Sequence, residues 1–88
     1  MTVTFRKSFL RDLKKLRDAR VHSQVRAVIE AIEDADALAD VPSVRKMSGA
    51  DGYYRVRIGD YRIGLAVEGD KVEFVRVLHR KEIYRYFP

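Results

Sequence analysis

The chain contains no cysteine, so neither a disulfide framework nor a zinc–thiolate site is available to it. Its two histidines, His22 and His79, lie far apart in the sequence, and we therefore expect no structural metal site. No apolar run reaches the ~18 residues that a membrane span requires, and no signal-peptide core follows Met1. We accordingly expect a cytoplasmic protein with no membrane segment and no small-molecule cofactor.

Basic side chains are missing from residues 30–40, which carry only acidic charges: Glu30, Glu33, Asp34, Asp36 and Asp40. The whole chain has a net charge of +5, so removing these five negative charges leaves +10 on the remaining residues. Part of the molecule must therefore be strongly basic, and such a surface attracts polyanions. An acidic protein partner, or a charge that serves only solubility, would fit the same composition.

The length of 88 residues allows one hydrophobic core. A chain of this size buries only about 60–65% of its unfolded surface, which is too little for two cores. Hydrophobic residues make up 47% of the composition, which argues against a disordered chain. We predict a single domain over residues 1–88.

The first forty residues predict a strand and two helices. Residues 2–5 alternate polar and apolar side chains, as a short strand does. Apolar residues then recur every three or four positions, which predicts amphipathic helices from Arg6 to about Arg17 and from a cap at Asp18 to about Asp34–Asp36. The short connection between them favours a helical hairpin whose apolar side is covered by a sheet.

The second half of the chain predicts a loop over residues 37–52 and then a three-stranded meander. Its strands, residues 53–58, 61–68 and 71–79, are joined by turns at Gly59-Asp60 and Gly69-Asp70. The tail, residues 81–88, is expected to form a short helix or turn. The fold predicted is an α+β domain of order β-α-α-β-β-β, with an antiparallel sheet packed on a helical hairpin and its other face exposed.

Alternation along these strands separates an apolar face from a charged one. The first two strands place Val56 and Leu65 in the core and their arginines on the opposite face. In the last strand we assign Val75 and Val77 to the core, which leaves Phe74 and Leu78 on the charged side. The charged face then gathers Arg55, Arg57, Arg62, Arg76 and Arg80. Like charges on neighbouring strands cost stability unless a carboxylate or ligand compensates, so the pattern favours a functional surface over a merely solvated one.

Three segments resemble the RelE/ParE superfamily of toxins from type II toxin–antitoxin systems. Residues 54–63, YRVRIGDYRI, are similar to a family segment "yRvrvGdyRv", and residues 77–84, VLHRKEIY, are similar to its "vghRrdvY" ending. Residues 9–16 are similar to the family's first helix. The resemblance covers nearly the whole chain and implies one toxin domain with a RelE-like fold.

The resemblance also implies a site. Arg62 matches an arginine that contacts the scissile phosphate, Arg80 matches a second phosphate-stabilising arginine, and Tyr84 matches a tyrosine near the C-terminus. Arg55 and Arg57 stand where RelE-like members often have lysines. We expect Arg62, Arg80, Tyr84 and His79 to be catalytic, and Arg55, Arg57, Arg76 and Lys81 to bind RNA.

The chemistry of the predicted site has cations in excess and no obvious base. RNA cleavage by its own 2′-hydroxyl needs a base, cations for the phosphorane and an acid for the leaving oxygen. Arginines bind phosphate in a bidentate manner but hardly deprotonate. His79, Tyr84 and Glu82 remain as candidates for proton transfer, and Tyr84 could instead stack on a base. His79 could equally be a half-buried structural histidine, and Tyr84 could simply close the core.

Three functions follow from these features. The resemblance implies a metal-free, ribosome-dependent endoribonuclease that cuts mRNA in the A site and inhibits translation. The alternatives are a ParE-like inhibitor of DNA gyrase and a non-catalytic RNA-binding module. The resemblance further implies a cognate antitoxin, RelB-like or of another class, and for the nuclease the ribosome and mRNA as partners. An acidic amphipathic antitoxin would fit the basic surface and apolar residues at the sheet rim, including Phe74 and Leu78.

Overall fold

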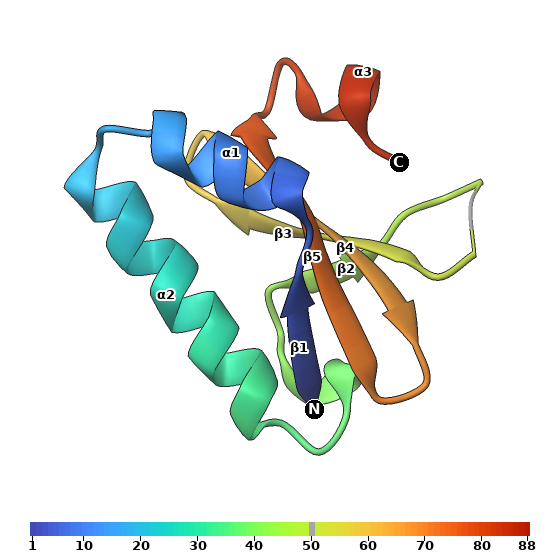
Figure 1. The fold of residues 1–88 in the computed structure, drawn as a ribbon. Coiled ribbons are helices and arrows are strands. Elements are labelled where there is room, and N and C mark those ends of the chain that lie inside the picture. Colours follow the sequence, from blue (N-terminus) through green and yellow to red (C-terminus); the bar gives the residue numbers. More distant parts are fainter. Residues whose placement is uncertain (50) are drawn as a thin grey trace.

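The computed structural model describes residues 1–49 and 51–88 and confirms the α+β class (Figure 1). Along the chain, the elements are β1 (Thr2–Phe5), α1 (Lys7–Lys15), α2 (Ala19–Asp34), a 3₁₀ turn (Leu38–Asp40), β2 (Val44–Lys46), β3 (Tyr53–Ile58), β4 (Tyr61–Glu68), β5 (Lys71–His79) and α3 (Ile83–Tyr86). The predicted strands at residues 2–5, 53–58, 61–68 and 71–79 are confirmed with these bounds. The tail, predicted as a short helix or turn, forms the short helix α3.

The strands form one mixed sheet in the order β1-β5-β4-β3-β2. The pairs β5–β4 and β4–β3 are antiparallel, as predicted. The pair β3–β2 is also antiparallel, whereas β1 lies parallel to β5. Strand β2 lies inside the segment predicted as a loop, and at three residues it is too short to show alternation in the sequence. Ala50, also in that predicted loop, lies outside the described residues.

Helices α1 and α2 cover one face of the sheet (Figure 1). Phe9 of α1 and Ile32 of α2 are fully buried, and they share the main core with Val56, Ile63 and Leu65 from the strands. Helix α1 packs along β5, while α2 packs against β1 and β3. The predicted cap of α2 is confirmed, because the Asp18 side chain accepts a hydrogen bond from the Arg20 N–H at 2.9 Å.

A β-bulge in β5 overturns the predicted faces of Phe74 and Val75. Leu65 lies opposite Phe74 and the preceding Gly64 lies opposite Arg76, so Val75 is an extra residue without a partner in β4. One extra residue reverses the alternation. Phe74 is therefore fully buried in the main core, whereas Val75 lies on the far face; Val77 is in the main core, as predicted.

A second, smaller core covers part of the face that was predicted to be exposed. It consists of Met47, Val75, Ile83 and Phe87, so α3 and the residue after it close over the sheet. The ring of Phe87 lies where a side chain at Gly64 would be, since a Cβ there would be 2.7 Å from the ring. The far face is thus divided into an apolar part under α3 and a charged part beside it.

None of the helices in the described part of the chain is long and apolar enough to span a membrane.

Candidate phosphate-binding site

Four arginines from three adjacent strands converge beside α3 on the far face of the sheet. Arg57 of β3 lies directly opposite Arg62 of β4, and Arg45 of β2 lies directly opposite Arg55 of β3. Together with Ser43 they line a hollow of about 420 Å³, which we call the arginine hollow. The hollow has the charge and the donor groups to hold a phosphate.

Arg62 is the most enclosed of these arginines, with 9% of its surface exposed. One terminal nitrogen, Nη1, donates to the carbonyls of Gly59 at 2.8 Å and Tyr61 at 2.9 Å, which fixes the guanidinium plane. Burial lowers the pKa of Arg62, and the charges of Arg57, Arg55 and Arg80 lower it further, while Asp60 acts in the opposite direction. The site therefore carries a surplus of positive charge that an anion would relieve.

Tyr84 stands at the edge of the arginine hollow. The Arg55 guanidinium carbon lies 5.6 Å from the centre of the Tyr84 ring. These two residues line an adjoining hollow of about 230 Å³ with Lys46, Met47 and Ser48. Because Arg55 belongs to both hollows, a chain of nucleotides could place a phosphate in one and a base against the exposed Tyr84 ring in the other.

Arg80 lies at the end of β5 next to the β3–β4 turn. Its Nε is 3.9 Å from the Asp60 carboxylate, and its N–H donates to the Asp60 carbonyl at 2.7 Å. Its charge contributes to the lowered pKa of Arg62, so the two arginines are electrostatic neighbours. Lys81 follows in the exposed turn before α3. The structure thus brings Arg55, Arg57, Arg62, Arg80 and Tyr84 to one region.

Arg76 is on the predicted face but does not join this set. Its guanidinium forms a bidentate ion pair with the buried carboxylate of Asp12, with contacts of 2.7 and 3.0 Å. The hydrogen bond to Asp12 raises the pKa of Arg76. The sequence did not reveal this partner, because Asp12 and Arg76 are far apart along the chain.

His79 lies on the opposite face of the sheet from the arginine hollow. It pairs with Tyr61, which packs against the main core, and the two rings meet edge to face with centroids 5.6 Å apart. Its Nδ1 accepts a hydrogen bond from the Lys81 N–H at 3.2 Å. The half-buried, hydrogen-bonded position that the sequence left open for His79 is the one observed, and it does not bring the ring to Arg62.

Arg45 and Ser43 line the arginine hollow but were absent from the predicted site. Arg45 is held by the carbonyls of Pro42 and Val44. Both residues are placed by β2, which brings them beside β3, and its three residues are too few to be recognised as a strand from the sequence. The only feature of the sequence that could have indicated Arg45 as a site residue was an arginine within an apparent loop.

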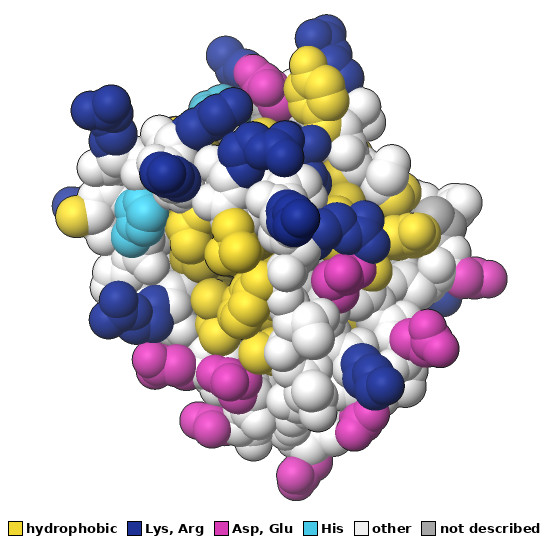
Figure 2. Space-filling view, viewed as in Figure 1, with side chains coloured by type: hydrophobic (Ala, Val, Ile, Leu, Met, Phe, Trp, Pro, Cys, Tyr) yellow, Lys and Arg dark blue, Asp and Glu magenta, His cyan; other side chains and the backbone are white. Residues whose placement is uncertain are grey.

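Charge is also distributed unevenly over the helix-covered face. Figure 2 shows Lys and Arg side chains gathered around α1, whereas acidic side chains dominate the end of the molecule where α2 finishes. This agrees with the acidic run at residues 30–40. The fold and the site therefore define the class of the protein: a small α+β protein with a strongly basic surface and a hollow lined by arginines.

Comparison with known proteins identifies the family. The model of a family described as "ParE toxin of type II toxin-antitoxin system, parDE" matches residues 3–84. The chain is 43% identical over 89 aligned residues to Toxin RelE3 of Methanocaldococcus jannaschii, and the alignment covers both chains completely. The chain therefore belongs to the RelE/ParE superfamily of toxins from type II toxin–antitoxin systems.

Solved structures agree with this assignment. The toxin in a RelB–RelE antitoxin–toxin complex from Methanococcus jannaschii matches with a TM-score of 0.81 at 40% identity, over 96% of this chain and 98% of that chain. A RelE–RelB complex from Pyrococcus horikoshii matches with a TM-score of 0.65 at 21% identity, over 90% and 93% of the two chains, and shows the shared fold.

Proposed function

We propose that this toxin is a ribosome-dependent endoribonuclease that cuts mRNA in the A site without a metal ion and thereby inhibits translation. The observation that carries the proposal is the convergence of Arg55, Arg57 and Arg62 with Tyr84 around one open surface. The similarity to a protein named RelE3 supports the RelE-like rather than the ParE-like activity.

In the proposed reaction, the arginine hollow holds the scissile phosphate. The 2′-hydroxyl of the preceding nucleotide loses its proton and attacks phosphorus, the bond to the 5′-oxygen breaks as that oxygen takes up a proton, and a 2′,3′-cyclic phosphate and a 5′-hydroxyl are formed. The carbonyl contacts of Nη1 orient Arg62 before substrate arrives, so its remaining N–H groups can meet the phosphorane charge with little reorganisation. Arg80 adds a second positive charge nearby.

Tyr84 is our candidate for proton transfer. It is exposed and shares a hollow with Arg55, whereas His79 faces the other side of the sheet. The arginine side chain offers hydrogen-bond donors and no acceptor, so these guanidinium groups serve as cations rather than bases. The Tyr84 ring also offers a stacking surface for a nucleotide base.

Inhibition of DNA gyrase is the second candidate, because the matching family model is that of the ParE toxin. A gyrase inhibitor needs no phosphate site on the far face of the sheet, so the arginine hollow argues against it. An RNA-binding module without catalysis would use the same hollow.

Mapping of a translating message after induced expression separates the three candidates. Cuts within codons only on ribosome-bound mRNA support the nuclease. Intact mRNA with double-strand DNA breaks indicates the gyrase inhibitor, and intact mRNA with neither effect indicates a binding module. The Arg62→Ala and Arg80→Ala variants should lose both cleavage and toxicity, whereas Arg26→Ala, an exposed arginine on α2, serves as the matched control.

We also infer a cognate antitoxin as the toxin's partner. Solved relatives were captured as antitoxin–toxin complexes, including RelB–RelE and YoeB–YefM. An acidic segment suits the basic surface. The rim residues expected to contact it need revision, because Phe74 is fully buried and Leu78 is half-buried against the second core. Expression of this chain without the antitoxin should therefore inhibit growth, and unaffected growth would contradict the proposed toxicity.

A further inference from the structure

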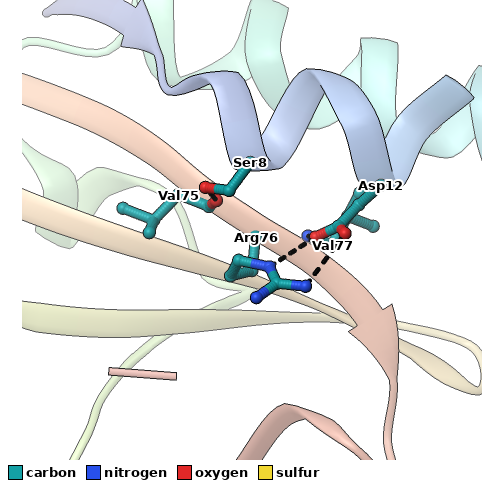
Figure 3. A network of polar contacts seen from close by, with 5 residues as sticks. All are labelled: Ser8, Asp12, Val75, Arg76 and Val77. Atoms are coloured by element: carbon teal, nitrogen blue, oxygen red, sulfur yellow. Dashed lines mark hydrogen bonds and ion pairs between the residues drawn. The ribbon is translucent and has the colours of Figure 1, made fainter. Parts of the chain in front are cut away.

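A network of polar contacts outside the arginine hollow joins α1 to β5 (Figure 3). Nε and Nη2 of Arg76 donate to the two carboxylate oxygens of Asp12. The same carboxylate accepts the Val77 N–H at 3.1 Å, and the Ser8 hydroxyl donates to the Val75 carbonyl at 2.6 Å. Asp12 is 7% exposed, so the guanidinium of Arg76 is fixed by a buried partner.

The network exists because β1 is shorter than β5. β1 ends at Phe5, which pairs with Phe74, and the edge of β5 beyond that point would be unpaired. Helix α1 takes the place of the missing strand, since Ser8 and Asp12 are four residues apart and project from one side of it. The bulge at Val75 lies on this stretch of β5, where Ser8 and Asp12 make their contacts. Helix α1 therefore holds the guanidinium of Arg76 through Asp12.

Arg76 also contacts α3 on its other side. Its guanidinium carbon lies 5.6 Å from the centre of the Tyr86 ring, and Arg55 lies at the same distance from Tyr84. Two arginines from different strands thus flank the short helix, one beneath each tyrosine. Ile83 and Phe87 are buried and attach α3 to the sheet, whereas the exposed tyrosines are held by these cation–aromatic contacts.

We propose that Arg76, held by Asp12, is a positioning residue for Tyr84. The apolar anchors keep α3 on the sheet, and the contact between Arg76 and Tyr86 sets the rotation of α3 that places the Tyr84 ring over Arg55. The surface of α1 is thereby linked to the edge of the arginine hollow through one ion pair and one short helix. The effect on cleavage rests on the nuclease activity proposed above, but the positioning itself does not.

The test uses the whole toxin with ¹⁹F-labelled tyrosine and follows each ring by NMR. In Arg76→Ala, the Tyr84 and Tyr86 signals should move toward their unfolded values, while the Tyr54 and Tyr61 signals stay in place. Amide exchange in α3 should become roughly two- to fivefold faster. Arg6→Ala is the matched control, because it removes the ion pair with Glu73 on the same strand without touching α3. An unchanged Tyr84 signal in folded Arg76→Ala would overturn the proposal.

Tyr86→Leu covers the case in which Arg76→Ala does not fold, since it leaves the buried ion pair intact. It should shift the Tyr84 signal in the same direction, and an unchanged signal there would also overturn the proposal. Arg76→Lys, which keeps the charge but loses the planar bidentate group, should fall between wild type and Arg76→Ala.

Cleavage kinetics on stalled ribosomes separate positioning from RNA contact. A positioning role predicts that Arg76→Ala lowers the saturated cleavage rate roughly two- to fivefold and leaves the half-saturating ribosome concentration unchanged. A raised half-saturating concentration with an unchanged rate would show that Arg76 contacts RNA instead. If the wild-type toxin cuts no mRNA, the nuclease proposal fails, and the NMR shift still decides whether Arg76 positions Tyr84.

Discussion

At the scale of single residues, the site is built from like charges that oppose each other. Arg57 and Arg62 are direct cross-strand partners, and the pKa of Arg62 is lowered by burial and by the neighbouring arginines. Like charges directly opposite each other on adjacent strands are destabilising, and an anion bound between them would relieve the repulsion.

Replacing Arg57 by Thr should therefore stabilise the free toxin. Removal of one of two opposing like charges on adjacent strands is worth roughly 0.5 kcal/mol at low ionic strength. Urea unfolding at about 10 mM and about 500 mM salt measures the effect, and the gain should shrink at high salt because the repulsion is screened. A loss of stability at low salt would show that Arg57 does not strain the sheet.

Gly64 illustrates a second constraint at this scale. A Cβ at this position would lie 2.7 Å from the Phe87 ring, so Gly64→Ala should lower the free energy of unfolding by about 1–3 kcal/mol. Urea unfolding of Gly64→Ala, Phe87→Leu and the double variant tests the cause. The double variant should lose less than the two single losses added together. Strict additivity would show that the ring does not cause the effect.

At the scale of elements, the bulge in β5 and the packing of α3 determine which side chains lie on the far face. Most of the fold was predictable, because the periods of the helices and the three long strands are clear in the sequence. The bulge was not, since the reversal of Phe74 and Val75 depends on pairing with Gly64 and Leu65 in β4. The parallel pairing of β1, the short strand β2 and the Asp12–Arg76 pair also arise only from tertiary contacts.

The two aspartates near α1 provide a prediction for this junction. Asp12→Ala should lower the free energy of unfolding by about 3 kcal/mol or more, because it leaves Arg76 and the Val77 N–H without their partner. Asp18→Ala removes only the exposed cap of α2 and should cost about 1 kcal/mol. Chemical denaturation of both variants gives the comparison, and equal losses would contradict the structural importance of the α1–β5 network.

At the scale of the whole molecule, positive charge is concentrated away from the acidic end of α2 (Figure 2). The candidate site was partly predictable: Arg55, Arg57, Arg62 and Arg80 gather as the alternation indicated, with Tyr84 beside them. Arg45 also lines the hollow, because β2 pairs with β3. Arg76 instead forms an ion pair with Asp12, and His79 packs against Tyr61 on the opposite face of the sheet. The sequence revealed the charge of the site, but not the partners that orient individual side chains or hold them away from it.

RNA binding should reflect this concentration of charge. For a short single-stranded RNA made uncleavable by 2′-deoxy substitution, each phosphate contact contributes roughly −0.7 to the slope of log affinity against log salt. Fluorescence anisotropy titrations should show a shallower slope by about that amount for Arg55→Ala, and no change for Arg26→Ala. Equal slopes for wild type and Arg55→Ala would exclude Arg55 as a phosphate contact.

Cleavage of mRNA on purified ribosomes stalled at one defined codon tests the proposed activity most directly. The reaction is run with wild-type toxin, Arg62→Ala and Arg26→Ala, and the ends of the fragments are analysed chemically. We predict a cut within the A-site codon that leaves a 5′-hydroxyl downstream and a 2′,3′-cyclic phosphate upstream, absent in Arg62→Ala and retained in Arg26→Ala. Intact message with the wild-type toxin, or equal cleavage by Arg62→Ala, would contradict the account.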